Sequence, residues 1–337
     1  MSSLSIGIVG LPNVGKSTLF NALTKKSVPA ENYPFCTIDP SVGIVPVPDE
    51  RLQILSLFSK SVKTIPAIIE FVDIAGLVAG ASKGEGLGNK FLSNIREVDA
   101  IAHVVRTFQD DLVIHVANKI DPLNDIGVIN LELILSDMEV VSKRIANLQK
   151  DVKKNDKEAI LEEAFLKRIE KALEEGKLAT EVDLTDEEKS KIKSLNLLSL
   201  KPMIYVMNVS EATENTEIEI PKEADGKEAI FVKIDPVFEK GFDDLIKKSY
   251  ELLGLETYFT TGEDETRAWT IKKGSTAPIA GMAIHTDFRD KFIRAEVVYW
   301  KDLIDSGSYT NARSKGLVRT EGKEYVVKDG DVIEFKI

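Results

Sequence analysis

The segment Gly10–Ser17 constrains this chain more than any other, because it matches the phosphate-binding pattern G-x-x-x-x-G-K-[ST]. Glycines in this pattern let the backbone curl, so that its N–H groups point at phosphate oxygens. Lys16 is expected to reach the β- and γ-phosphates, which makes it a catalytic as well as a binding residue, and Ser17 is expected to ligate Mg²⁺. An apolar run at 6–9 precedes the loop and a helical segment at 19–23 follows it, as expected for a strand and a helix whose N-terminus faces an anion. The predicted nucleotide-binding residues of this loop are Asn13, Val14, Gly15, Lys16, Ser17 and Thr18.

Two further motifs indicate a switch around the same phosphates. Asp73 follows an apolar run at 67–72, and an aspartate at such a strand end can hold Mg²⁺ through water. Gly76 can offer its backbone N–H to a γ-phosphate, which makes the following loop sensitive to hydrolysis. Thr37 lies between the motifs and is placed to complete the Mg²⁺ shell when a triphosphate is bound. The sequence therefore predicts a Mg²⁺ site made by Ser17, Thr37 and Asp73.

The residue that orients the hydrolytic water differs from the common one. Residue 77 is leucine, where many GTPases carry a glutamine. One hypothesis is that Asn13 helps to hold a monovalent cation, so K⁺ is a second candidate cofactor. The other is that His115 positions the water, although core packing is an equal alternative for a lone histidine on an apolar strand.

Two segments compete to read the nucleotide base. Asn118–Asp121 is a literal N-K-x-D guanine-reading motif, and Asn208–Glu211 is a degraded version of it. A parallel crossover needs a dozen or more residues, and too few lie between the apolar run at 100–105 and Asn118. Asn208 directly follows the apolar run at 203–207, so the topology favours Asn208, Val209 and Glu211 as base-reading residues.

This choice changes the expected ligand. A site that stops matching a hydrogen-bonding group loses discrimination by orders of magnitude. Without the aspartate that accepts from the guanine amine, adenine becomes acceptable and ATP is favoured over GTP. A GTPase that uses Asn118–Asp121 remains the alternative, and paired ATP and GTP titrations distinguish the two.

The order of apolar runs predicts an α/β fold, a P-loop G domain with a doubly wound, mostly parallel sheet. We expect its first part at 1–127 and its second part at 200–254, around an inserted helical hairpin or coiled coil at 128–199. A capping box formed by Thr185 and Glu188 predicts a short helix in the insertion. Residues 255–337 are expected to form a small α+β domain. The heptad seam of the first inserted helix comprises Leu131, Ile134, Met138, Val141, Ile145, Leu148 and Val152.

Composition excludes several classes of function. The chain has 337 residues and a net charge of −11, which argues against non-specific nucleic-acid binding by the whole molecule. No sequence-specific DNA partner is expected. No apolar run approaches the roughly 20 residues that span a membrane, and no secretory signal opens the chain. Cys36 is the only cysteine, and the three histidines show no metal-ligand spacing. These features predict a cytoplasmic protein with no membrane partner, expected to be a monomer.

The motif set resembles the YchF family, the Obg-like ATPases, over nearly the whole chain. The matching segments are 10–24, 32–38, 71–78, 80–89, 208–211, 265–271, 284–288 and 321–323. The resemblance implies a translation-factor-class G domain, a helical hairpin and a C-terminal TGS domain. It also implies that ATP is favoured over GTP, that the protein acts near the ribosome with rRNA or ribosomal proteins as partners, and that His115 is the hydrolytic residue. The sequence departs from the family at Asn118–Lys119 and at Lys233–Pro236, where relatives carry a Ser-Ala loop that contacts the base.

The resulting hypothesis is a slow ATP-hydrolysing switch that signals through ribosome binding. The alternative is a nucleotide-gated adaptor that recruits RNA or protein and whose hydrolysis is incidental. Replacement of Lys16 or Ser17 separates the two, because an adaptor keeps its function when hydrolysis is lost but binding is not.

Overall fold

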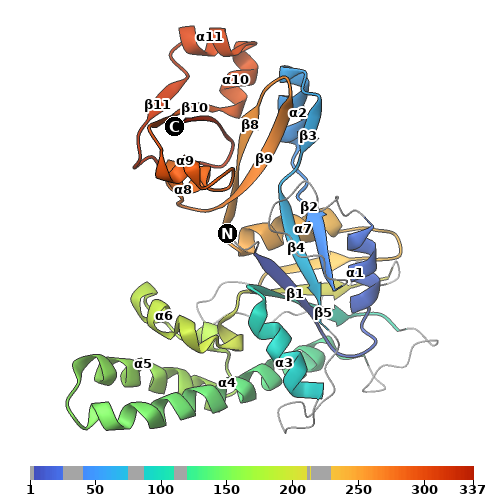
Figure 1. Cartoon of the computed structure of the whole chain (residues 1–337). Helices are drawn as coiled ribbons and strands as arrows, with labels where there is room; N and C mark the ends of the chain where they lie inside the picture. The colour runs from blue at the N-terminus through green and yellow to red at the C-terminus, as the bar shows by residue number, and fades with distance from the viewer. Residues whose placement is uncertain (1–3, 26–40, 75–86, 110–119, 211–212, 214–228) are drawn as a thin grey trace.

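The computed structural model describes residues 4–25, 41–74, 87–109, 120–210, 213 and 229–337 (Figure 1). Its first sheet has six strands in the order β2-β4-β1-β5-β6-β7, and only β2 runs antiparallel to its neighbour. From β1 the sheet grows outward in both directions, which confirms the predicted doubly wound G-domain fold. The strands are β1 Ser5–Val9, β2 Val42–Pro46, β4 Ile68–Asp73, β5 Ala100–Arg106, β6 Met203–Asn208 and β7 Phe231–Ile234.

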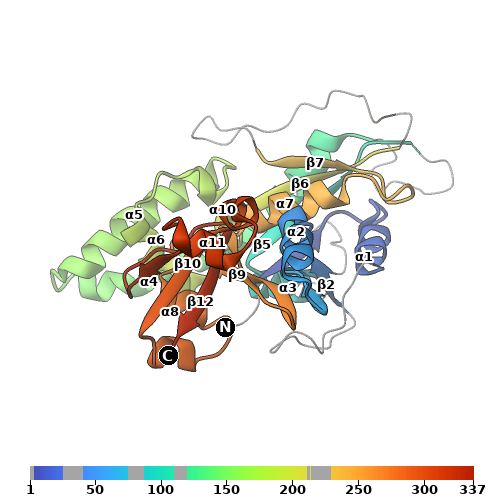
Figure 2. The same ribbon diagram turned by 90° about the horizontal axis from the view of Figure 1, so that it is seen from above.

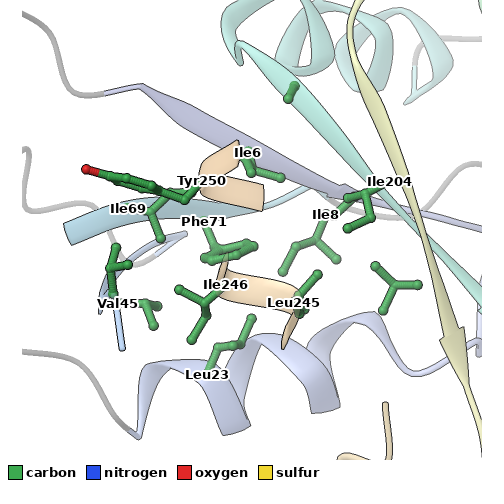
Figure 3. Close-up of a cluster of buried hydrophobic side chains, with 14 of the residues drawn as sticks. Ile6, Ile8, Leu23, Val45, Ile69, Phe71, Ile204, Leu245, Ile246 and Tyr250 are labelled. Atoms are coloured by element: carbon green, nitrogen blue, oxygen red, sulfur yellow. The ribbon is translucent and has the colours of Figure 1, made fainter. Parts of the chain in front are cut away.

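Helices cover both faces of this sheet. On one face, α1 (Lys16–Thr24) and α7 (Phe242–Leu252) pack on the apolar side chains of the central strands (Figure 3). Leu23 of α1 and Ile246 of α7 meet Phe71 there, and all three are almost fully buried. The other face is covered by α3 (Leu87–Glu97) and by the first turns of α4 (Pro122–Val152). Burial on both faces explains why these strands are continuous apolar runs rather than alternating ones.

The long helix α4 belongs to two cores in turn. Ile129 and Leu133 pack with the sheet, whereas Ile134 and the seam residues after it pack with α5 (Lys157–Glu174). The hairpin so formed projects from the sheet on the side away from the C-terminal strands (Figure 1). Leu131 was expected in the heptad seam, and this was wrong, because α4 still faces the sheet at that height and leaves Leu131 half exposed (52%).

Polar contacts fix the insertion internally and to the G domain. The capping box of Thr185 and Glu188 is present at the start of α6 (Asp186–Ile192), as predicted. Arg144 of α4 donates two hydrogen bonds to Glu162 of α5, at 2.6 and 2.8 Å. Asp137 is fully buried and accepts from the backbone N–H of Ser199 at 2.7 Å, which ties α4 to the segment that leads into β6.

A second sheet forms the C-terminal part, in the order β11-β10-β12-β8-β9-β3. Short helices α8 (Ala277–Gly281) and α9 (Asp287–Asp290) pack on one face of it, and α10 (Trp300–Ser306) and α11 (Tyr309–Ser314) pack on the other (Figures 1 and 2). Its strands are β3 Lys63–Ile65, β8 Leu255–Thr261, β9 Glu265–Lys272, β10 Arg294–Tyr299, β11 Arg319–Glu321 and β12 Asp331–Lys336. None of the helices in the described ranges combines the length and apolar character that crossing a membrane requires.

One strand and one helix of this sheet layer come from the N-terminal part of the chain. β3 pairs in parallel with β9, and α2 (Glu50–Ser59) packs against β8, β9 and α10. Arg51 of α2 donates to Asp49 and to Asp329, and its guanidinium lies 5.2 Å from the ring centroid of Phe259. Ser61 donates to the carbonyl of Gly262 at 2.6 Å. Residues 50–65, expected in the first part of the G domain, therefore complete the C-terminal sheet layer.

We predict that α2 stabilises the C-terminal sheet. Leu55 is fully buried in the core that includes Phe259 and Ala268, so Leu55→Ala should lower the free energy of unfolding by about 2–5 kcal/mol. Hydrogen exchange should rise in β8 and β9. Leu57→Ala on the same helix is the control, because Leu57 is 70% exposed and its loss should change little. Faster exchange confined to β1, β4 and β5 would contradict the prediction.

A buried histidine makes the stability of the first sheet depend on pH. His103 of β5 is 1% exposed, and its ring centroid lies 5.6 Å from that of Tyr205. Its Nδ1 has no hydrogen-bond partner among the residues that the structure describes. Burial, and to a smaller extent the charge of Lys16, lowers the pKa of His103 from 6.5 to about 3. The folded protein therefore holds this imidazole neutral.

Below pH 6.5 the unfolded chain binds a proton at residue 103 that the folded chain does not bind. We expect the free energy of unfolding to fall by up to about 1.4 kcal/mol per pH unit for this reason, until the pH approaches 3. Denaturant unfolding of His103→Leu between pH 7 and 4 should show a shallower slope than the wild type. Equal slopes in the wild type and in His103→Leu would show the prediction to be wrong.

Candidate functional site

The loop Gly10–Ser17 lies across the carboxyl ends of β1 and its neighbours. Gly10 approaches β5 so closely that a Cβ there would stand 2.5 Å from the carbonyl oxygen of Val104. Gly15 has φ +97° and precedes the first residue of α1, and a Cβ on it would stand 2.3 Å from Nδ2 of Asn208. Both positions require glycine, one for the close approach and the other also for its conformation. The loop and the N-terminus of α1 thus form a cradle suited to phosphate oxygens.

Lys16 lies inside this cradle and is mostly buried. Its ammonium group donates to the carbonyl oxygen of Leu11 at 2.8 Å. Burial lowers the pKa of Lys16 to about 8, against an opposing effect of Asp73. A bound anion would oppose the desolvation and favour the charged form.

Two of the predicted metal ligands lie together. The Oγ of Ser17 donates to Oδ2 of Asp73 at 3.4 Å, so the start of α1 and the end of β4 present two oxygen ligands at one point. Mg²⁺ prefers such oxygen ligands and keeps several waters, with phosphates completing its shell. The pair therefore fits this ion. The part of the chain that the structure describes holds no cluster of three or more His, Cys, Asp or Glu side chains suited to a metal.

Asn208 at the end of β6 connects the neighbouring strand to the loop. Its Nδ2 donates to the carbonyl oxygen of Val14 at 2.9 Å, which also fixes which amide atom is nitrogen. Asn208 is 4% exposed, and its Oδ1 has no hydrogen-bond partner among the described residues. A buried acceptor without a partner is uncommon, and it is suited to a ligand that brings a donor.

The sheet order bears on the competing N-K-x-D segment. β6 pairs directly with β5, from Ile101 beside Met203 to Arg106 beside Asn208. Asp121 instead caps α4, where its side chain accepts from the backbone N–H of Asn124. The segment that ends at Asn208 is therefore the one beside β5, as the crossover argument requires.

A cavity of about 510 Å³ joins these groups. Of the predicted residues it brings together the phosphate-loop set and Asn208 with Val209. Sequence analysis singled out Asp235 and Pro236 as part of a loop near the base, but it did not assign the other lining residues. Those residues lie at or just beyond the ends of β5, β6 and β7, and their place at strand ends in a parallel sheet is the signal that could have found them. The lining residues are Asn13, Val14, Gly15, Lys16, Ser17, Thr18, Arg106, Phe108, Asn208, Val209, Ser210, Asp235, Pro236, Val237 and Phe238. Thr37, Gly76, His115 and Glu211 lie outside the described residues.

Among the unassigned residues, Arg106 and Phe108 form a fixed pair. The Nε of Arg106 donates to the carbonyl oxygen of Phe108 at 3.0 Å, and its guanidinium lies 4.9 Å from the Phe108 ring centroid. Arg106 also donates to the carbonyl oxygen of Asn13 at 3.5 Å. This pair gives the cavity a positive charge and an aromatic face on the β5 side.

Comparisons with known proteins agree along the chain. Residues 5–135 match a family model described as a 50S ribosome-binding GTPase, and residues 255–337 match the YchF-GTPase_C model, described as a protein of unknown function (DUF933). The chain is similar to the ribosome-binding ATPase YchF of Bacillus subtilis, with 52% identity over 362 aligned positions that cover 99% of each chain. The Haemophilus influenzae protein of the same name is 49% identical, with 98% of each chain covered.

A solved structure extends the likeness to the whole fold. The structure of the Schizosaccharomyces pombe YchF GTPase matches with a TM-score of 0.86 and 37% identity, over 100% of this chain and 98% of that one. The relatives' names therefore differ on the nucleotide, since two are called ATPases and one a GTPase.

Proposed function

The chain belongs to the YchF family, and we propose that it is a nucleotide-dependent switch that binds and hydrolyses ATP and acts at the ribosome. We further propose a cytoplasmic monomer whose ribosomal partners are rRNA or ribosomal proteins. The family supplies the class of activity. The choice of ATP over GTP rests on one observation, the buried and unpartnered Oδ1 of Asn208, a residue that lines the cavity.

Adenine and guanine offer different hydrogen-bonding groups on the edge that carries N7. Adenine presents the N6 amine as a donor beside the N7 acceptor, whereas guanine presents the O6 and N7 acceptors. Oδ1 of Asn208 matches the adenine amine and opposes guanine O6. One N–H of Nδ2 is used by Val14, and the other remains suited to N7. Asparagine can therefore take both adenine atoms at once.

In the proposed mechanism the phosphate loop binds the triphosphate through its backbone N–H groups. Lys16 exchanges the carbonyl of Leu11 for the β- and γ-phosphates. Ser17, Thr37 and, through water, Asp73 would hold Mg²⁺, which supplies neutralisation of phosphate charge. Gly76 would sense the γ-phosphate, Glu211 would border the base, and His115 would position the attacking water, with K⁺ held near Asn13 as an additional source of positive charge.

We predict that the protein binds ATP more tightly than GTP, by about 5- to 150-fold for one matched bidentate contact. N6,N6-dimethyl-ATP, which lacks the N6 donor, should bind about as weakly as GTP. The measurement is calorimetric titration, with 2′-deoxy-ATP as a control that leaves the base unchanged.

Co-sedimentation with ribosomes in ATP, ADP or no nucleotide should then show binding that depends on the nucleotide. Tighter binding of GTP, or ribosome binding that ignores nucleotide, would reject the proposal.

Hydrolysis gives a separate prediction. Lys16→Ala should abolish ATP turnover because it removes the cation at the γ-phosphate, and chelation of Mg²⁺ should do the same. His115→Ala should lower turnover by about 100-fold or more while ATP affinity stays near the wild-type value. Turnover in K⁺ should exceed that in Na⁺. Phosphate release under single-turnover conditions measures all four effects, and an unchanged rate in His115→Ala would remove that residue from the mechanism.

A further inference from the structure

The loop that follows β7, residues 235–240, forms a rigid lip on the cavity. The carboxylate of Asp235 accepts from the backbone N–H groups of Val237 at 3.0 Å and Phe238 at 3.2 Å. The backbone of Asp235 also pairs with that of Lys240 in both directions, each at 3.1 Å. The two ends of the loop are thus tied together, and the side chains at its tip project from a fixed turn.

Gly241 fixes how the chain leaves this turn. It has φ +80°, and a Cβ on it would stand 2.1 Å from the carbonyl oxygen of Lys233. The chain therefore folds back against β7 and starts α7 at Phe242. Because both the turn and its exit are constrained, the position of the tip is set by the backbone rather than by contacts of its side chains.

The tip carries two apolar side chains that lack cover. Val237 is 78% exposed and Phe238 is 61% exposed, yet both line the cavity together with Pro236. Single exposed apolar residues need no explanation, but two adjacent ones held on the wall of a ligand cavity do. A ligand that packs against these two side chains would displace the water that now surrounds them.

The rest of this end of the cavity is consistent with a flat, apolar ligand group. Val209, almost fully buried, and Phe108 line the cavity as well, together with Asn208. Arg106 and Asp235 also line the cavity, as do the polar and charged groups of the phosphate loop. A purine has apolar faces and a polar edge, so a cavity with both apolar and polar lining residues matches it.

We propose that Val237 and Phe238 form an apolar wall against which the nucleobase packs, and that Phe238 contributes most of its binding energy. This inference rests on the proposed function, because it concerns the same cavity. Asn208 then reads the edge of the base, and the lip binds its face without distinguishing purines.

The test compares Phe238→Ala with Phe231→Ala. Phe231 is a matched control, because it lies at the start of β7, the strand that leads into this loop, is 37% exposed and does not line the cavity. Each variant is titrated with ATP, GTP and inorganic tripolyphosphate, which has no base. Phe238→Ala should weaken ATP and GTP alike by about 5- to 100-fold, as expected for loss of one base-stacking aromatic, and should leave tripolyphosphate unchanged. Phe231→Ala should change none of the three, and Phe238→Tyr should restore nucleotide binding.

The outcomes show whether this inference fails alone or together with the proposed function. If the wild type binds ATP and Phe238→Ala stays within twofold of it, the lip is not a base wall, while the proposed function stands. If tripolyphosphate weakens as much as ATP, Phe238 supports the loop rather than the base, and the inference is again rejected. If the wild type binds tripolyphosphate but no nucleotide, both the inference and the proposed function fail. Thermal melting of each variant shows whether it is folded.

Discussion

The candidate site depends on the parallel pairing of β1, β5 and β6, which brings three strand ends to one edge of the sheet. The phosphate loop lies directly on those ends, with room for no more than a hydrogen at Gly10 and Gly15. Asn208 then joins β6 to the loop through Val14. The same contact therefore shapes the phosphate cradle and places the group that we assign to the base, so neither part can shift without the other.

The two sheets are joined by the chain segment that also carries Asp73, the aspartate of the proposed metal site. After β2 the chain leaves the first sheet, forms α2 and β3 on the second, and returns as β4, which ends at Asp73. Only Pro66 and Ala67 separate the last residue of β3 from the first of β4. A rearrangement of β4 relative to the C-terminal sheet must therefore be accommodated within two residues, one of them a proline with fixed φ. The nucleotide site and the C-terminal sheet are covalently close despite their separate folds.

Local signals made much of this structure predictable. The phosphate loop, the capping box at Thr185 and the strand before Asn208 each depend on a few neighbouring residues, and the topology argument placed β6 from connection length alone. The pairing of β3 with β9 was not predictable in this way, because it joins residues about 200 positions apart and β3 is only three residues long. Leu131 was misassigned because a heptad pattern does not say where a helix changes the core against which it packs. Phe238 gave no signal, since an exposed aromatic acquires meaning only from the cavity beside it.

Several features of the site reduce the stability of the free protein. A buried acceptor without a partner, such as Oδ1 of Asn208, costs about 1–3 kcal/mol. Lys16 is held in a desolvated position that lowers its pKa, and Phe238 leaves an aromatic ring in water. A nucleotide with a matching donor, phosphates and an apolar face relieves all three at once. In the proposed function, a ligand that lacks the donor leaves the first penalty in place, so the same unpartnered oxygen that destabilises the free site would let it discriminate between bases.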